Sequence, residues 1–198
     1  MLKRLFEDPM LQVNRLLGEI YKISVFFRKG ITIGRSVKFK GTPILQNYGG
    51  EIIRGNHSTL YSTAYGYFAH FTHRTRLFVE DGGLIQIGDN VRINGSTLHA
   101  REKIVVGDGT LIAANTSIID SNGHPLALAN PALRVTCKDE PAPIIIGKNV
   151  WIGVNCVILK GVQLGDGCVV AAGTIVGKEI PPGSIAYGNP MKIKEKND

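Results

Sequence analysis

Apolar residues recur every six positions over the last third of the chain. Six blocks of six residues run without a gap from Ile146 to Pro181, and each begins with an aliphatic residue. A period of six matches neither the 3.6-residue period of a helix nor the alternation of a simple strand. It does match a coil of three short strands per turn, with the aliphatic positions stacked inside and Gly, Asn and Asp at the corners. The pattern therefore predicts an all-β triangular prism.

Shorter runs of the same repeat precede this stretch. Two blocks begin at Ile87, the pattern slips by one residue, and it resumes at Val106 and continues to Ile118. Because an extra residue needs room at a corner, the slip predicts a bulged corner within residues 98–103. Residues 31–90 contain one recognisable block, and we predict irregular early coils there.

The repeat is absent between Asp120 and Pro143, a segment that contains four prolines and begins with Asp-Ser-Asn-Gly-His-Pro. Long segments without regular structure are uncommon inside compact domains, and those that occur are often functional. We therefore predict a loop extruded from the coils over residues 120–143.

A helix is predicted before the coils. Asp8 followed by Pro9 is a good helix start, and Lys29-Gly30 ends the pattern. Apolar residues recur on one side of this helix at Met10, Val13, Leu17, Ile20 and Phe27. The favoured role is to cover the open end of the coils, because exposed strand edges need cover. The alternative is a weak contact with a membrane surface, since Lys22, Arg28 and Lys29 accompany Phe26 and Phe27.

The repeat resembles that of the hexapeptide-repeat acyltransferases, whose fold is a left-handed parallel β-helix. The left hand is implied by the resemblance, because the general rule for parallel crossovers favours the right hand. Sugar O-acetyltransferases of the galactoside and maltose type are most similar, from Ile87 to Lys194. The expected organisation is a helical cap at 1–30, a β-helix at 31–194 and a polar tail at 195–198.

The resemblance implies a catalytic base. Gly123-His124-Pro125 reproduces the family motif in which the histidine takes a proton from the acceptor hydroxyl. Imidazole titrates near neutral pH, so it can accept this proton as the hydroxyl attacks a thioester and pass it to the leaving thiolate. Asn94 matches a family asparagine beside the base, although Asn94-Gly95 is also a good turn pair. Asp120 could orient His124, but a turn role is favoured for it.

The resemblance also implies the acyl donor and the assembly. The donor is acetyl-CoA, which the family lays along the late coils between two subunits of a homotrimer. Val154 stands where relatives often have Ser, and its backbone N–H could still face the thioester oxygen. The matched donor-binding positions are Trp151, Val154, Ala172, Gly177, Lys178 and Lys192. Ordinary coil geometry explains the small residues nearly as well.

Charge and cysteine content limit the partners and the compartment. The chain has 23 Lys and Arg against 16 Asp and Glu, which favours an anionic partner. No basic block or nucleic-acid motif is present, so the phosphates of coenzyme A are preferred over nucleic acid. Three cysteines are an odd number and argue against a disulfide framework, so Cys156 and Cys168 are interpreted as buried thiols. With no convincing signal peptide and no apolar run long enough to span a membrane, a cytoplasmic location is expected.

The sequence therefore predicts an acetyl-CoA-dependent O-acetyltransferase that acts on a sugar or glycan hydroxyl and needs no metal. One alternative is transfer to another hydroxyl, such as that of a streptogramin antibiotic or serine. A second is a zinc carbonic anhydrase on the same fold, which needs three converging histidines that the spacing does not show. A third is a non-catalytic β-helix subunit. The acceptor, the acyl chain length and the roles of His70, His73 and His99 stay open.

Overall fold

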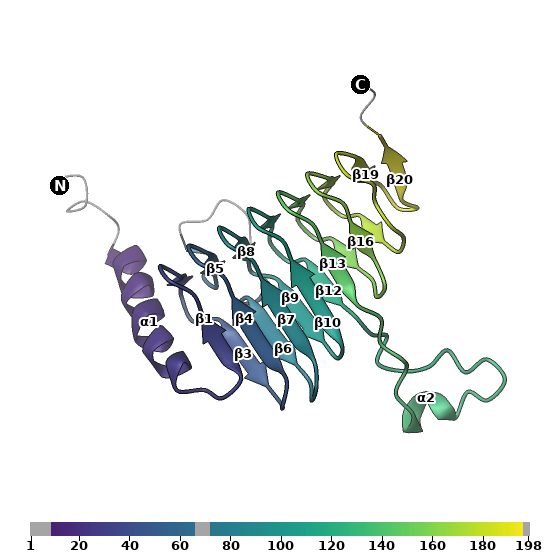
Figure 1. Cartoon of the computed structure of the whole chain (residues 1–198), viewed down its shortest axis with the longest axis horizontal. Coiled ribbons are helices and arrows are strands. Elements are labelled where there is room, and N and C mark those ends of the chain that lie inside the picture. Colours follow the sequence, from purple (N-terminus) through teal and green to yellow (C-terminus); the bar gives the residue numbers. More distant parts are fainter. Residues whose placement is uncertain (1–8, 66–71, 196–198) are drawn as a thin grey trace.

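The computed structural model describes residues 9–65 and 72–195. The chain winds as a parallel β-helix into a triangular prism, as Figure 1 shows. The hexapeptide repeat and the three mostly parallel sheets agree with the predicted all-β, left-handed β-helix. His70 and the expected helix cap Asp8 lie outside the described residues.

Three sheets form the prism faces, and each of the first six coils contributes one strand to each sheet. The second sheet has two further strands, the last of which is antiparallel. The first sheet contains β1 (Ile31–Ile33), β4 (Glu51–Arg54), β7 (Leu84–Ile87), β10 (Lys103–Val106), β13 (Ile144–Ile146) and β16 (Gln163–Leu164). The second contains β2 (Lys38–Lys40), β5 (Thr59–Tyr61), β8 (Arg92–Asn94), β11 (Leu111–Ile112), β14 (Trp151–Ile152), β17 (Val169–Val170), β19 (Ile185–Tyr187) and β20 (Lys192–Lys194). The third contains β3 (Ile44–Asn47), β6 (Arg76–Val79), β9 (Thr97–Ala100), β12 (Ser117–Ile119), β15 (Val157–Ile158) and β18 (Ile175–Val176).

The first position of each late block points into the prism, as predicted. These side chains are buried and stack on their equivalents one coil away. Ile146, for example, pairs with Leu164 in the next coil. The corners need left-handed backbone, and they place Asn149 and Asn155 at φ 54° and 57°. The column of aliphatic side chains is therefore the core, and removal of its apolar surface from water stabilises each coil against the next.

The predicted bulged corner is present at Arg101 and Glu102, between β9 and β10. Leu98 pairs with Ile118, twenty positions later instead of the eighteen of a regular coil. The early coils are irregular in length, as predicted. Their strands stack in parallel, but Ile31 pairs with Ile52, 21 positions later, and Leu45 pairs with Leu77, 32 positions later, instead of the eighteen of a regular coil.

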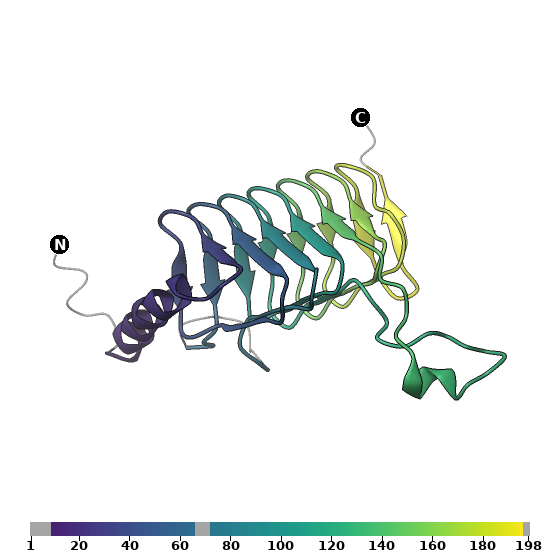
Figure 2. The same cartoon turned by 60° about the horizontal axis from the view of Figure 1, so that its bottom comes forward.

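Helix α1 (Pro9–Phe26) covers the strand edge of the first coil, as Figures 1 and 2 show. The face that touches the coils is not the apolar side seen in the sequence. Gly18 and Val25 are the buried residues of α1, and a Cβ atom at Gly18 would stand 2.0 Å from the carbonyl oxygen of Phe39. Glycine therefore allows the helix backbone to approach β2 closely, which a larger residue would prevent. Among the described residues, no helix has the length and apolar character that crossing a bilayer requires.

Arg54 departs from the apolar core of the early coils. Its guanidinium is almost completely buried and lies over the ring of Phe39, with Cζ 5.0 Å from the ring centroid. No side-chain nitrogen of Arg54 has a hydrogen-bond partner within the described part of the chain. Burial lowers the pKa of Arg54 to about 9, because the charged form loses hydration.

Candidate functional site

The predicted loop leaves the prism between β12 and β13 and projects to the side, as Figures 1 and 2 show. We call the prism edge where the chain passes from the third sheet to the first the loop edge. The loop contains one short helix, α2 (Leu133–Thr136). It is thus a projecting segment with its own local structure, rooted at one edge of the coils.

Asp120 fixes the N-terminal root of the loop. It is fully buried, and its carboxylate accepts the backbone N–H groups of Arg101, Glu102 and Lys103, each at 2.8 Å. Those three donors belong to the bulged corner of the preceding coil. The carboxylate oxygens are therefore engaged with backbone, as the favoured turn role requires, and not with His124.

Asp139 joins the two ends of the loop. This side chain is 6% exposed and accepts hydrogen bonds from the Asn122 backbone N–H at 2.7 Å, Arg101 Nη1 at 2.8 Å and Lys160 Nζ at 2.8 Å. Burial alone would raise the pKa of the Asp139 carboxyl, but the bonds from Lys160 and Asn122 and the Arg101 charge outweigh it, so the pKa is lowered. The ionised carboxylate thus holds the loop against three successive coils.

Glu80 extends this ionic cluster. Its carboxylate contacts Lys138 Nζ at 2.8 Å, His99 Nε2 at 3.1 Å and Arg101 Nε at 3.6 Å. The hydrogen bond from Lys138 is the main reason that the pKa of Glu80 is lowered. The His99 ring packs edge-on against Phe78. The sequence analysis did not predict this cluster, because the partners of Glu80 lie 19 to 58 positions from it and no local sequence pattern indicates the contacts.

His124 lies just beyond the fixed root of the loop. It is exposed and follows Gly123, whose backbone has φ +78° and whose N–H is bonded to Ser121 Oγ at 3.2 Å. Among the described residues, the His124 ring has no hydrogen-bond partner. Because the root of the loop is fixed, the exposed imidazole of His124 is able to take a proton from a hydroxyl that docks beside it.

Asn94 does not join His124 within one chain. It is fully buried at the end of β8, and its Nδ2 donates to the carbonyl oxygen of Ile112 at 3.1 Å. Its Oδ1 has no partner in the described part of the chain. Asn94 stands at a different prism edge, where the chain passes from the second sheet to the third. We call this the Val154 edge.

The predicted donor-binding residues divide between two edges and one face. Val154 and Ala172 stack on successive coils at the Val154 edge, where Gly173 N donates to Val154 O at 2.9 Å. Gly177 and Lys178 lie instead at the loop edge, two coils beyond the loop. Trp151 is half-exposed on the second sheet, and Lys192 is exposed on β20 of the same sheet.

Backbone donors are available at the Val154 edge. Within the described residues, the N–H groups of Val154 and Ala172 have no hydrogen-bond partner, whereas Gly153 N donates to Val170 O at 2.8 Å. Val154 is partly exposed and Ala172 is exposed. These two donors can therefore face a ligand that lies along the edge.

Two further features lie elsewhere. A hollow of about 510 Å³ lies between the end of α1 and β3, at the end of the prism opposite the late coils (Figure 1). Both ring nitrogens of His73 are close to threonine hydroxyls, those of Thr72 at 2.9 Å and Thr97 at 3.3 Å. In the described ranges, no three His, Cys, Asp or Glu side chains are grouped so that they could hold a metal ion.

The cysteines give a direct check of the coil packing. Cys156 and Cys168 are buried, as predicted, and Cys137 is exposed on the loop. Burial raises the pKa of the Cys156 thiol and raises that of Cys168 to about 11.

We expect a thiol reagent to label one cysteine per native chain rapidly and all three after denaturation, measured by mass spectrometry. Rapid native labelling of Cys156 or Cys168 would contradict the packing of the late coils.

Comparison with known proteins finds a matching family model and similar proteins for this chain. The family model "hexapeptide repeat of succinyl-transferase" matches residues 143–178. A galactoside O-acetyltransferase of Escherichia coli is 41% identical over 119 residues, which cover 59% of this chain and 57% of that protein. A putative lipopolysaccharide biosynthesis O-acetyl transferase of the same species is 33% identical over 120 residues, covering 58% and 61%. The chain thus spans less than two thirds of the length of these relatives.

Solved structures share the fold at low identity. An N-acyltransferase from Bacillus cereus in complex with dTDP and coenzyme A matches with a TM-score of 0.63, 19% identity and coverage of 91% of this chain and 89% of that one. A hexapeptide-repeat acetyltransferase from Vibrio cholerae with acetyl coenzyme A has a TM-score of 0.54, 21% identity and coverage of 97% and 92%. Taken with the curated relatives, these likenesses confirm the predicted resemblance to hexapeptide-repeat acetyltransferases.

Proposed function

We propose that this protein, which carries the hexapeptide repeat and left-handed β-helix of the acyltransferases, is an acetyl-CoA-dependent O-acetyltransferase acting on a sugar or glycan hydroxyl. The observation that carries the proposal is His124, an exposed imidazole beside a loop root fixed by Asp120 and Asp139. The names of the two Escherichia coli relatives, a galactoside O-acetyltransferase and a putative lipopolysaccharide biosynthesis O-acetyl transferase, support a glycan acceptor.

The proposed reaction needs a base and a site for developing negative charge. His124 takes the proton of the acceptor hydroxyl as its oxygen bonds to the thioester carbonyl carbon. The carbonyl oxygen gains charge, which the unbonded N–H of Val154 can stabilise by a hydrogen bond. The carbon–sulfur bond then breaks, and the protonated imidazole returns its proton to the thiolate. The products are an acetyl ester and free coenzyme A.

Completion of this site requires a neighbouring copy. His124 belongs to the loop edge and Val154 to the Val154 edge, so one chain does not bring them together. In a homotrimer of prisms packed side by side, the loop edge of one copy faces a neighbour, and the donor lies between them. Exposed apolar side chains on the second sheet, among them Trp151, Ile185 and Tyr187, support such side-by-side packing.

The test is thiol release from acetyl-CoA across a panel of sugars, nucleotide sugars, oligosaccharides and antibiotics. We expect release that depends on a hydroxyl acceptor of the glycan class and that occurs in a trimeric species by analytical sedimentation. Thiol release with antibiotics but with none of the glycans would contradict a glycan acceptor and support transfer to a non-sugar hydroxyl. A fully active monomer would contradict the shared site.

A further inference from the structure

The side of α1 that is turned away from the coils is apolar and exposed. Leu16 and Ile23 are each 62% exposed, and Phe27 in the turn after the helix is 85% exposed. At 100° per residue, the apolar residues occupy an arc of about 200° that avoids the buried Gly18 and Val25. The exposed apolar set comprises Met10, Val13, Leu16, Leu17, Ile20, Ile23, Phe26 and Phe27. We call this set the α1 face.

Positive charge is concentrated at the same end of the molecule. Residues 9–60 contain eight Lys and Arg against two Asp and Glu, a net charge of +6 out of the +7 of the whole chain. One of the two acidic residues, Glu19, is paired with Lys22 at 3.3 Å. The rest of the chain, including the loop and the late coils, is nearly neutral. The bulk charge that suggested coenzyme A therefore lies with α1 and the first coils.

We propose that the α1 face docks on an anionic lipid bilayer, with the helix lying in the plane of the interface. Interfacial helices combine a broad apolar face with Lys and Arg on the polar side, and electrostatic attraction to anionic lipid adds to apolar burial. A single partner helix would need only a narrow seam of apolar residues. The arc of the α1 face is wider than such a seam, and a flat apolar surface can cover it.

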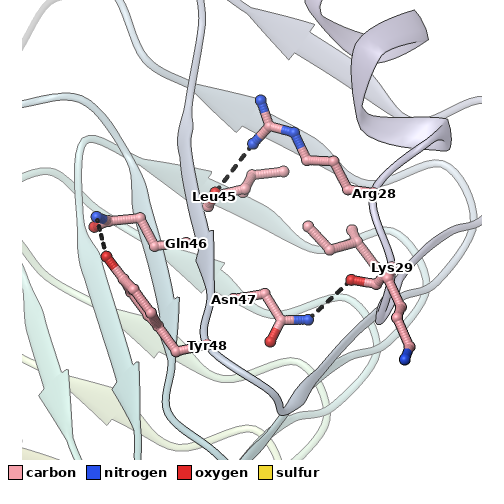
Figure 3. A pocket seen from close by; sticks show the side chains of 7 residues that line it. Arg28, Lys29, Leu45, Gln46, Asn47 and Tyr48 are labelled. Carbon is pink, nitrogen blue, oxygen red and sulfur yellow. Dashed lines mark hydrogen bonds between the residues drawn. The ribbon is translucent and has the colours of Figure 1, made fainter.

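The helix is firmly joined to the coils that it would anchor. Gly41 N donates to the carbonyl oxygen of Asn14 at 3.1 Å, on the side of α1 that faces β2. Figure 3 shows the turn after the helix, where Arg28 Nη1 donates to Leu45 O at 3.1 Å and Asn47 Nδ2 donates to Lys29 O at 3.1 Å. The exposed Phe27 is therefore carried on a turn that is tied to β3.

Docking would set the height of the loop above the lipid. The loop root lies three to four strand spacings from the first coil, which is about 15–20 Å along the prism. In the proposed homotrimer, three copies of α1 would stand at one end and bind the bilayer together. This consequence rests on the proposed function, whereas the docking itself needs no transferase activity. The two can therefore fail separately.

The test is co-sedimentation of the full chain with vesicles of phosphatidylcholine, with and without phosphatidylglycerol. We expect binding to the anionic vesicles that weakens at raised ionic strength. The triple variant Leu16→Gln, Ile20→Gln, Ile23→Gln should lower the partition coefficient by about tenfold or more, because these side chains supply the apolar burial. All three are exposed, so the fold should be kept.

A matched control replaces three apolar residues of the loop that are even more exposed, Leu126→Gln, Leu128→Gln and Val135→Gln. This control should bind vesicles as the unchanged protein does. Equal losses in both triple variants would overturn the assignment to α1. Absence of vesicle binding, with a change in oligomeric state of the α1 variant alone, would overturn the proposal and assign the α1 face to contact with a second copy.

Discussion

His124→Ala is expected to lower kcat by about 10²–10⁴-fold, the usual contribution of a general base. The side chain is exposed on the loop and has no hydrogen-bond partner among the described residues, so its removal opens no core cavity. Binding of acetyl-CoA, followed by calorimetry, should be nearly unchanged, because the loss falls on proton transfer rather than on donor affinity. Steady-state thiol release on the purified variant measures the effect.

Two further variants make this result specific. His124→Gln keeps a polar side chain but cannot titrate near neutral pH, so it should lose as much turnover as His124→Ala. His57→Asn replaces an exposed histidine of the early coils, at a corner with φ 57° that asparagine tolerates, and should leave turnover unchanged. A His124→Ala protein that keeps more than about a tenth of the turnover would lie outside the range for a general base.

Asp120→Ala is expected to destabilise the protein by about 3 kcal/mol, because three backbone N–H groups of the bulged corner lose their acceptor in a buried site. Asp120→Asn keeps one carbonyl oxygen and should lose less. The measurement is the change in thermal unfolding midpoint and in denaturant midpoint against the unchanged protein.

Asp108 offers a matched control. It makes the same kind of bond, accepting the backbone N–H of Asp89 at 2.9 Å in the coil before it, but its side chain is 51% exposed. Water can replace the lost acceptor there, so Asp108→Ala should have a much smaller effect than Asp120→Ala. Equal losses of stability for the two variants would contradict this explanation, because the larger loss for Asp120→Ala is attributed to burial of the corner at Arg101.

The late coils could be predicted from the sequence because every block repeats the same local requirements. Ile146, Ile152 and Ile158 each stand where a coil needs an inward aliphatic side chain, and Asn149 and Asn155 stand where a corner needs left-handed backbone. The loop was predictable for the opposite reason, since its prolines and lack of period exclude it from the coils.

Other features depend on contacts between distant residues. Nothing near Asp139 in sequence indicates that it meets Arg101 and Lys160. The packing side of α1 is decided by the close approach that Gly18 permits, which overrides the apolar side that periodicity detects. Asn94 is fully buried and lies away from His124 because β8 ends at a different prism edge from the loop. The thirty-residue spacing between Asn94 and His124 in the sequence does not reveal this.

The central proposal is that His124 promotes transfer of an acetyl group to a glycan hydroxyl. The most direct measurement is transfer of a radiolabelled acetyl group from acetyl-CoA to a glycan acceptor, with the product then treated with mild alkali. O-acetyl transfer predicts one alkali-labile ester on the acceptor for each coenzyme A released, and no such product with the His124→Ala protein. Label recovered in an alkali-stable amide, or the same ester yield without His124, would contradict the account.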